Sequence, residues 1–400
     1  MKKKILIVSH AMELGGAERS LLGLLETIDY SRYDIDLFLL RHEGELLSSI
    51  PKKVHLLPQI PAYTVLARPL KKVVKERHFL LAVARIYGKI RAAFFDKKNN
   101  YDDSIVALEY SHKYTYKLMP QIRPDQNYDV AISFLTPHYI VANNIHAKKK
   151  IAWIHTDYSQ IQLDVSSEEK MWETYNYIIS ISKAVTEGFI EIFPSLKNRV
   201  ILVENILPSK LILKQAEKLD VSKEMPKEGI RVLSIGRYCI AKNFDNVPDI
   251  CRKLCEKGVD IYWYIIGFGE GEELVRRKII ENAMEKRVIL LGKRENPYPY
   301  IRACDLYIQP SRYEGKSVAV REAQLLRKPV LITNYPTAKS QVEDGIDGII
   351  APLDNEECAA EIKRVLDNKE LIDQLVQNCS ERDYSNSQEI EKIYQLVDTD

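Results

Sequence analysis

Short apolar runs alternate with longer stretches of helical periodicity along the whole chain. In the first half, runs that suit buried strands occur at residues 5–9, 33–40, 129–134, 150–157, 177–182 and 200–205. In the second half they recur at residues 230–236, 260–267, 288–292, 305–308 and 329–332. Strands separated by helices are typical of parallel sheets covered on both faces, so we expect one doubly wound sheet in each half.

Residues 208–229 interrupt this alternation. The segment is rich in charge and shows no strand pattern. A chain of 400 residues also exceeds the ~250–300 residues at which single cores stop growing. The sequence therefore predicts an α/β protein with a first domain over residues 1–207, a linker over residues 208–229 and a second domain over residues 230–385.

The stretch that follows the apolar run at residues 305–308 has the pattern of an anion-binding site. Gly315 breaks the apolar pattern, and helical periodicity begins near Lys316. A strand, a glycine turn and a helix N-terminus leave the first helical amides unpaired, and the helix dipole favours negative charge there. Lys316 and Ser317 can add a cation and a hydroxyl. We therefore expect a phosphate here; an exposed helix with ordinary surface glutamates is the alternative.

Two glutamates, Glu314 and Glu322, frame this stretch. If the interval were helical, its eight residues at ~1.5 Å each would separate them by ~12 Å. The paired carboxylates of a glycosidase lie roughly 5 to 9.5 Å apart, so the spacing argues against that chemistry. It suits two carboxylates that hold hydroxyl groups at opposite ends of a ligand with phosphates in its middle. A nucleotide-sugar has this layout.

Two cations follow the first strand of the second half. Arg237 offers a fixed fork of donors and Lys242 a point cation, and both suit a diphosphate. Two ordinary surface cations are the alternative. As ligands of a diphosphate, Arg237 and Lys242 would stabilise the negative charge on the leaving group.

A glycine-rich turn, Gly267-Phe-Gly-Glu-Gly271, follows the next strand. It is similar to a dinucleotide-binding fingerprint, but Glu270, Glu272 and Glu273 would repel a pyrophosphate. No matching acidic ribose ligand follows downstream. We therefore reject a dinucleotide site here.

The first half offers a glycine pair and a histidine at strand ends. Gly15 and Gly16 stand between the first strand and the next helix, where glycines let a backbone approach a ligand closely. A plain tight turn is the alternative. His155 follows a strand at its carboxyl end, where open α/β sheets bind ligands. A lone histidine is also compatible with a structural role.

Four motifs resemble those of family-four retaining glycosyltransferases. The most specific is the E-x7-E pattern of Glu314 and Glu322, after a Pro-Ser step and before a Lys-Pro-Val strand. The others are Gly-Arg-x4-Lys-Asn at residues 236–243, Gly-Gly-Ala-Glu at residues 15–18 and Trp-Ile-His-Thr-Asp at residues 153–157. The resemblance is strong in the second half and looser in the first.

The resemblance implies the GT-B fold, in which two Rossmann-like domains face a central cleft. It further implies that residues 386–400 form a helix that packs back on the first domain. In that family, residues at the positions of Glu314 and His155 contact the donor sugar and the residue at the position of Glu322 contacts the ribose. Because Lys316 and Ser317 occupy variable positions of the motif, the donor sugar stays open.

The resemblance also implies contacts around the diphosphate, the base and the acceptor. By position, these residues are Arg237 and Lys242 at the pyrophosphate, Gly315, Lys316 and Ser317 at the leaving group, Gly267 in the nucleotide pocket, Arg294 at the base, and Gly15 and Gly16 at the sugar and acceptor.

Residues 68–98 combine cations with apolar residues at mostly helical spacing. Ten of these residues are basic and two are acidic. A basic amphipathic helix is typical of an interfacial membrane binder, with each cation worth about 1 kcal/mol near an anionic surface. A surface helix whose apolar stripe faces its own domain is the alternative. We expect contact with an anionic membrane, which would bring an enzyme to a lipid-linked acceptor.

Composition narrows these possibilities. The chain is 46% apolar and 28% charged with a formal net charge of +2, which gives no reason to expect a nucleic-acid partner. We expect neither a transmembrane helix nor a signal peptide, because the apolar runs are too short. The six cysteines form no C-x-x-C pair and suit reduced thiols. Asp34 and Asp36 alternate with apolar residues of a strand, so we expect no metal there.

The resemblance implies a retaining, metal-independent glycosyltransferase, and we predict that it has no cofactor besides its donor substrate and no covalent nucleophile. By default the donor is a UDP-hexose. The acceptor is a hydroxyl of a lipid-linked saccharide or related glycan of a bacterial capsule or exopolysaccharide, at the cytoplasmic face of the membrane. A UDP-sugar 2-epimerase of the same fold, a non-catalytic nucleotide-sugar-binding paralogue and a peripheral membrane scaffold are the alternatives.

Overall fold

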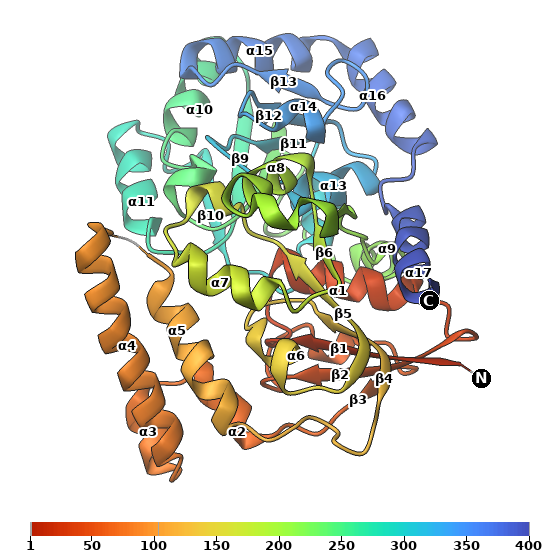
Figure 1. Ribbon diagram of the computed structural model, residues 1–400. Coiled ribbons are helices and arrows are strands. Elements are labelled where there is room, and N and C mark those ends of the chain that lie inside the picture. The colour runs from red at the N-terminus through yellow and green to blue at the C-terminus, as the bar shows by residue number, and fades with distance from the viewer. Residues whose placement is uncertain (1, 103, 400) are drawn as a thin grey trace. The chain divides into compact units, whose positions relative to one another are not determined.

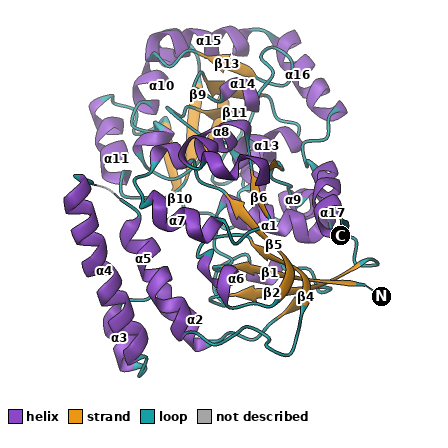
Figure 2. Cartoon of the chain, in the orientation of Figure 1, coloured by secondary structure: helices purple, strands orange, loops and turns teal. Residues whose placement is uncertain are grey.

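The computed structural model describes residues 2–102 and 104–399. The chain divides into two compact units, and each contains one parallel sheet with helices around it (Figures 1 and 2). Unit 1 comprises Met1–Ile206 and Gln388–Asp400, and unit 2 comprises Leu207–Ser387.

The sheet of unit 1 has seven strands within the described ranges, in the order β3-β2-β1-β4-β5-β6-β7. All the pairs are parallel; Ile5, for example, pairs with Ile35 on one side and Val130 on the other. The order reverses between β1 and β4, and ligands of open α/β sheets bind at such a reversal, beyond the carboxyl ends of the strands. The strands are β1 (Lys3–Ser9), β2 (Tyr33–Leu39), β3 (His55–Leu56), β4 (Tyr128–Ser133), β5 (Ala147–Ile154), β6 (Tyr177–Ser180) and β7 (Val200–Leu202).

Helices connect these strands, and side chains cap several of them. The Asp164 carboxylate accepts the Ser167 amide at the start of α7, and the Ser182 hydroxyl accepts the Val185 amide at the start of α8. The helices of unit 1 are α1 (Gly16–Thr27), α2 (Pro61–Thr64), α3 (Leu70–Lys75), α4 (Phe79–Asn99), α5 (Val106–Thr115), α6 (Tyr139–Asn143), α7 (Val165–Trp172), α8 (Lys183–Ile192) and α17 (Ile390–Asp398). Short 3₁₀ turns include η4 (Tyr158–Gln160).

Unit 2 repeats the plan with the strand order β10-β9-β8-β11-β12-β13, again all parallel. The order reverses between β8 and β11. The strands are β8 (Ile230–Ile235), β9 (Ile261–Ile266), β10 (Val288–Gly292), β11 (Leu306–Gln309), β12 (Val330–Thr333) and β13 (Ile349–Ala351). The helices are α9 (Ser209–Ala216), α10 (Val247–Glu256), α11 (Glu272–Glu281), α12 (Tyr298–Ala303), α13 (Val318–Leu325), α14 (Ala338–Gln341), α15 (Asn355–Asp367) and α16 (Lys369–Glu381), with the 3₁₀ turn η6 (Ile240–Lys242).

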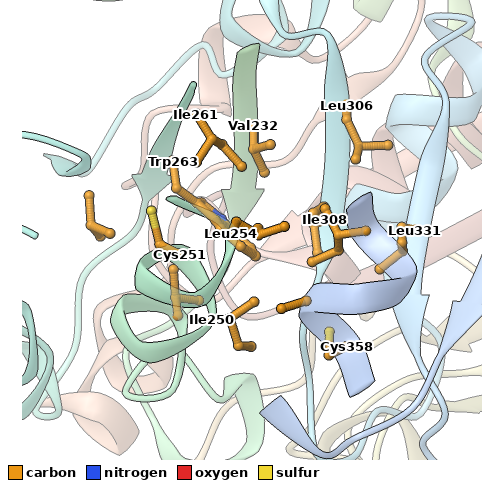
Figure 3. Close-up of a cluster of buried hydrophobic side chains, with 14 of the residues drawn as sticks. Val232, Ile250, Cys251, Leu254, Ile261, Trp263, Leu306, Ile308, Leu331 and Cys358 are labelled. Atoms are coloured by element: carbon orange, nitrogen blue, oxygen red, sulfur yellow. The ribbon is translucent and has the colours of Figure 1, made fainter. Parts of the chain in front are cut away.

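Both faces of the unit 2 sheet are buried, as in a doubly wound fold. Val232 and Trp263 point to one face, where they belong to the same buried cluster as Leu254 of α10 (Figure 3). Their neighbours in sequence, Leu233 and Tyr264, point to the other face and join the cluster that includes residues of α9, α12 and α13. This alternation explains why the strands read as continuous apolar runs in the sequence.

The predicted linker over residues 208–229 is instead part of unit 2. Ile212 and Ala216, one helical turn apart on α9, are buried in the same cluster as Met225. Charged residues of this segment, such as Lys218, are exposed to solvent. The linker prediction was wrong because a short helix needs few apolar residues to cover a sheet, and the surrounding charges hide them in the sequence.

The C-terminal helix α17 belongs to unit 1. The rings of Tyr33 and Tyr394 stack with their centroids 5.0 Å apart. The Asp29 amide donates to the Tyr394 hydroxyl at 2.7 Å, and the Tyr33 hydroxyl donates to Asp398 at 2.8 Å. These contacts tie the end of the chain to β2 and the loop before it.

Candidate functional site

Glycines end three adjacent strands of unit 2 and bring their backbones into contact. The Gly236 amide donates to the Ile266 carbonyl at 3.0 Å, and the Gly267 amide donates to the Gly292 carbonyl at 3.1 Å. A Cβ atom on Gly267 would lie only 1.9 Å from the Gly236 carbonyl oxygen. Gly267 is therefore required by backbone packing, whatever it contributes to a nucleotide pocket.

Lys242 folds back over the first of these glycines and meets Glu314. A Cβ atom on Gly236 would lie 3.1 Å from Cδ of Lys242, so the glycine makes room for the lysine stem. Lys242 Nζ donates to Glu314 Oε1, and the two side chains are 20% and 10% exposed. Two candidate residues that are 72 positions apart in the sequence thus form one ion pair.

A chain of buried hydrogen bonds orients Glu314. The Ser311 hydroxyl donates to Glu314 Oε1 at 2.7 Å, and Gln309 Nε2 donates to the Ser311 hydroxyl at 2.9 Å. The Tyr307 hydroxyl donates to Gln309 Oε1 at 2.8 Å. Since Tyr307 and Gln309 lie on β11 and are fully buried, the chain fixes the carboxylate from the sheet core.

Arg312 is a positioning residue that the sequence did not indicate. Its guanidinium donates two hydrogen bonds to the Asp245 carboxylate, at 2.9 and 2.7 Å, and one to the Ile240 carbonyl at 2.8 Å. The Arg312 amide also donates to the Ala241 carbonyl at 2.8 Å. Together these bonds hold the loop that carries Lys242 against the loop that carries Glu314. No local pattern links an arginine to an aspartate 67 residues earlier.

Helix α13 begins at Val318, two residues later than the predicted start at Lys316. The Ser317 amide donates to Gln341 Oε1 at 2.7 Å, and the Ser317 carbonyl accepts from Gln341 Nε2 at 3.2 Å. Gln341 thus occupies one of the amides that we expected to face a phosphate. A Cβ atom on Gly315 would meet nothing within 4 Å, so space beside this turn is open.

Glu322 is completely buried, whereas the sequence suggested a ligand contact. The Tyr298 hydroxyl donates to Glu322 Oε1 at 3.0 Å and so connects α12 with α13. A ribose contact by this carboxylate therefore stays a prediction.

The other candidate cations of unit 2 differ in their surroundings. The Arg237 side chain is exposed, and no hydrogen bond or ion pair joins it to another residue in the described part of the chain. Arg294 pairs with Glu224, and its Nε donates to the Tyr300 hydroxyl at 2.9 Å. The Arg294 guanidinium lowers the pKa of Glu224. Arg237 is thus available to a ligand, whereas Arg294 is engaged within unit 2.

In unit 1, helix α1 begins at Gly16, Gly15 is its N-cap residue, and the Glu18 side chain lies beside Gly15. A Cβ atom on Gly15 would lie 2.0 Å from Glu18 Oε2, because this carboxylate folds back over the helix N-terminus. Burial raises the pKa of Glu18. Because the contact with Gly15 involves the end of a flexible side chain, which can move away, it does not by itself require glycine at this position.

His155 stands at the carboxyl end of β5, where the sequence predicts it. Its ring is nearly parallel to that of Trp153, with centroids 6.2 Å apart, and lies 4.9 Å from the ring of Phe134. Nε2 is enclosed and has no hydrogen-bond partner among the described residues. Burial lowers the pKa of His155 to about 4, so the imidazole is neutral at pH 7 and keeps a polar atom available.

The two aspartates of the Asp-x-Asp sequence in β2 contact other side chains. Asp36 Oδ1 lies 2.8 Å from His55 Nδ1, and Asp36 Oδ2 accepts the Tyr128 hydroxyl at 2.5 Å. Asp34 lies 3.3 Å from Lys2 Nζ. Over the residues that the structure describes, no group of three or more histidines, cysteines or carboxylates is arranged to hold a metal ion.

Residues 68–98 form α3 and α4, and α4 packs along α5 (Figure 1). Its inward face includes Leu81, Gly88 and Ala92. The opposite face carries a stripe of large apolar side chains that are 45–71% exposed, and we call it the α4 face: Phe79, Leu80, Val83, Ile86, Tyr87, Ile90 and Phe94. Within the described ranges, no helix is both long enough and apolar enough to cross a bilayer.

Two of the ten cations counted in this segment do not belong to an exposed basic surface. Arg85 points inward, and its Nη1 donates to the carbonyls of Val65 at 2.5 Å and Arg68 at 2.7 Å. Arg68 is paired with Glu76. The remaining eight are exposed: Lys71, Lys72, Lys75, Arg77, Lys89, Arg91, Lys97 and Lys98. At about 100° per residue, Lys89 and Arg91 fall on opposite edges of the α4 face.

Comparisons with known proteins agree on one class. Residues 215–382 match the family model of glycosyl transferases group 1. The chain is 26% identical over 152 residues to the alpha-D-kanosaminyltransferase of Streptomyces kanamyceticus, covering 37% of this chain and 39% of that protein. It is 24% identical over 168 residues to the UDP-Gal:alpha-D-GlcNAc-diphosphoundecaprenol alpha-1,3-galactosyltransferase of Escherichia coli, covering 41% and 43%. Less than half of either relative is thus matched.

Among solved structures, Anabaena Alr3699/HepE in complex with UDP and glucose is similar over almost the whole chain. The TM-score is 0.69 at 17% identity, and the match covers 98% of this chain and 99% of that one. This likeness confirms the predicted fold class, the GT-B fold of two Rossmann-like domains. Separately, the family match over residues 215–382 shows that this part of unit 2 is similar to glycosyl transferases group 1.

Proposed function

We propose that the chain is a glycosyltransferase that takes its sugar from a nucleotide diphosphate sugar bound by unit 2. The observation that carries this proposal is the Lys242–Glu314 ion pair, with the unpaired Arg237 on the same loop as Lys242. The pair joins the loops after β8 and β11, which flank the reversal of strand order. Open α/β sheets bind their ligands at such a reversal.

Each residue of this group has a role in the proposed donor site. Lys242 has three N–H donors, so it can keep Glu314 and still donate to a phosphate oxygen. Arg237 offers a second, forked set of donors. The open space beside Gly315 lets a ligand approach the N-terminus of α13, whose dipole favours negative charge. Glu314 then has a free carboxylate oxygen for a sugar hydroxyl.

The proposed reaction is a front-face displacement with retention of anomeric configuration. The bond between the anomeric carbon and the diphosphate oxygen breaks, and the acceptor oxygen bonds to the same face of that carbon. The acceptor proton passes to the departing phosphate oxygen. Arg237, Lys242 and the amides of α13 stabilise the negative charge that develops on the leaving diphosphate. Of these groups, the two cations make the main electrostatic contribution.

A uridine nucleotide is the donor that we propose, with a hexose as the sugar. The HepE structure contains UDP and glucose, and the Escherichia coli relative is described as using UDP-Gal. That relative acts on a diphosphoundecaprenol-linked sugar, which supports a lipid-linked saccharide as the acceptor. We assign recognition of the acceptor to unit 1.

The α4 face supports peripheral contact with the inner face of an anionic membrane. Contiguous apolar surface of this kind is unusual on a protein that has no partner for it. Exposed cations on both edges would place ammonium and guanidinium groups at the level of anionic headgroups while the apolar stripe enters the interface. Membrane contact of α4 would bring unit 1 to a lipid-linked acceptor.

A thermal-shift screen with UDP-, GDP- and ADP-sugars tests the donor assignment, because a ligand that binds only the native state raises Tm by mass action. We expect UDP-sugars to raise Tm most. NMR of the products then separates the proposed transfer from a 2-epimerase, which would convert the donor without an acceptor. In Glu314→Gln, turnover of the selected donor should fall at least ~100-fold, or about 2.7 kcal/mol of barrier. Full activity of that variant would overturn the residue roles.

A further inference from the structure

Unit 1 contains a cavity of about 160 Å³ beyond the carboxyl ends of β4 and β5. Its walls come from α5, the loop after β4, the end of β5, η4 and α7. Leu108, Thr136 and Thr156 lie at the edge of the cavity and are exposed, so it opens to the surface. In an engineered protein, a cavity of roughly 150 Å³ admitted a six-membered carbon ring, so this volume suits one ring of that size.

Two polar side chains that line the cavity have atoms without partners in the described chain. Glu109 is only 5% exposed; one oxygen accepts the Asp164 amide, and Oε2 has no hydrogen-bond partner. Nε2 of His155 likewise has none. Leaving an enclosed polar atom unsatisfied costs about 1–3 kcal/mol, so both atoms are expected to have a partner when the site is in use.

The polar groups of the cavity are largely uncharged at neutral pH. Burial lowers the pKa of His112 to about 3 and that of His155 to about 4. Burial and the neighbouring Glu168 carboxylate raise the pKa of Glu109 far above its ordinary value, so this pair of carboxyl groups keeps a proton. No lysine or arginine lines the cavity within the described residues. A phosphate would therefore find no cation here.

Aromatic and aliphatic walls complete the site. The rings of Trp153 and Tyr158 line the cavity, together with aliphatic residues of α5 and β5. A pyranose ring offers hydroxyl groups at its edge and C–H groups on its faces, so it matches neutral hydrogen-bonding groups set between apolar walls.

We propose that this cavity is a subsite for an uncharged sugar ring, in which Glu109 hydrogen-bonds a ring hydroxyl. We identify this ring as part of the glycan acceptor, and this identification rests on the proposed function. Helix α5 then links two parts of acceptor recognition. Glu109 and His112 face the cavity, whereas Val106 and Tyr110 face Ala92 and Phe95 of α4, the helix proposed to bind lipid.

Binding of simple glycosides to the full-length protein tests the subsite without any transfer reaction. Methyl α-D-glucopyranoside, methyl α-D-galactopyranoside and methyl N-acetyl-α-D-glucosaminide serve as uncharged probes in ligand-observed NMR and calorimetry. We expect at least one to bind the wild type. Glu109→Met should weaken that affinity at least tenfold, whereas Glu109→Gln, which keeps a hydrogen-bonding group of the same shape, should retain most of it.

A substitution at the buried Glu109 could weaken binding by disturbing the fold, so two further variants at exposed positions serve as checks. Leu108→Arg adds bulk at the exposed mouth without entering the core, and it should also weaken glycoside binding at least tenfold. Glu173→Met, an exposed glutamate outside the cavity, should bind as the wild type does. The proposal is overturned if no probe binds the wild type, or if Leu108→Arg and folded Glu109→Met bind like the wild type.

UDP affinity, measured on the same samples, separates this inference from the proposed function. We expect all variants to bind UDP as the wild type does, since the nucleotide residues lie in unit 2. Absence of glycoside binding by the wild type, with UDP binding intact, would contradict only the subsite. Glycoside binding that depends on Glu109, in a protein that binds no nucleotide, would contradict only the donor assignment.

Discussion

Lys242 Nζ donates a hydrogen bond to Glu314 Oε1, and this ion pair joins the two loops that flank the reversal of strand order in unit 2. Lys242 lies in the loop after β8, and its side chain packs over Gly236. Glu314 lies in the loop after β11, where the Ser311 hydroxyl donates to its carboxylate. The pair brings a cation and a carboxylate to one place on the sheet edge where a charged ligand is expected.

Breaking this pair on one side should destabilise unit 2, because Glu314 would keep its charge in a partly buried position. For Lys242→Met we expect a loss of about 1–3 kcal/mol in the free energy of unfolding. The double variant Lys242→Met/Glu314→Gln should recover part of the loss, since it leaves no unpaired charge. Urea unfolding of the four proteins of this cycle measures the coupling. Strict additivity would contradict the pairing.

Arg237 should matter for ligand binding and not for folding. It has no partner among the described residues, so Arg237→Ala should change the free energy of unfolding by less than about 0.5 kcal/mol. The same variant should lose at least tenfold in UDP affinity by calorimetry, because a forked donor of the diphosphate is removed. Arg277→Ala, an exposed arginine of α11, is the matched control and should alter neither quantity. Unchanged UDP affinity in Arg237→Ala would remove this residue from the donor site.

The α4 face should bind anionic vesicles through its apolar stripe. Ile86→Glu/Ile90→Glu replaces two exposed residues of the stripe and should reduce co-sedimentation with phosphatidylglycerol vesicles at least tenfold. Ile280→Glu is the control, since Ile280 is an apolar residue on α11 of unit 2 that is even more exposed, at 66% against 45% for Ile86 and 50% for Ile90. Wild-type binding should also weaken as salt increases, because the cations act through a screened potential. Equal loss in both variants, or none, would argue against this surface.

The Glu109–Glu168 pair should make stability depend on pH. The native pKa of Glu109 lies far above its ordinary value of 4.5, because of burial and the charge of Glu168. The unfolded chain therefore releases this proton first, and stability should fall as pH rises from about 4.5 to the native pKa. The Asp164 amide opposes this rise in the pKa of Glu109, the Asp164 carboxylate adds to it, and Lys113, on the same helix, opposes it.

Glu109→Gln should remove this dependence. We expect the wild type and Glu109→Gln to melt alike near pH 5. By pH 8 the variant should be more stable by at least ~1 kcal/mol, or about 2–4 °C in Tm for a domain of this size. Glu173→Gln controls for the loss of an exposed carboxylate. A difference between variant and wild type that stays constant from pH 5 to pH 8 would show that the pair does not hold a proton.

The sequence predicted the strands except β3 and β13, and most of the loops that carry the candidate site, because buried parallel strands leave continuous apolar runs. The sequence indicates Lys242 and Glu314 as ligand residues, but it does not indicate their ion pair. Contacts across 72 residues leave no local pattern, and the same is true of Arg312 and Asp245. The inward turn of Arg85 was missed for a related reason, since a sequence shows a charge but not the carbonyl groups that satisfy it.

The glycines show a second limit. The sequence places Gly267 beside a ligand, yet this glycine is also required by the backbone of the neighbouring strand. Gly315, by contrast, has open space beside it. Close approach of a ligand and close packing of the protein's own backbone both favour glycine. The sequence alone therefore does not distinguish these two causes.

Hydrogen–deuterium exchange of the full-length protein with and without UDP tests the central claim most directly. We predict that UDP slows exchange in peptides that cover residues 236–243 and 311–322, which lie at the ends of β8 and β11. Peptides from α15 and α16 should exchange at the same rate in both states. Protection confined to other parts of unit 2, or exchange unaffected by saturating UDP, would contradict the account.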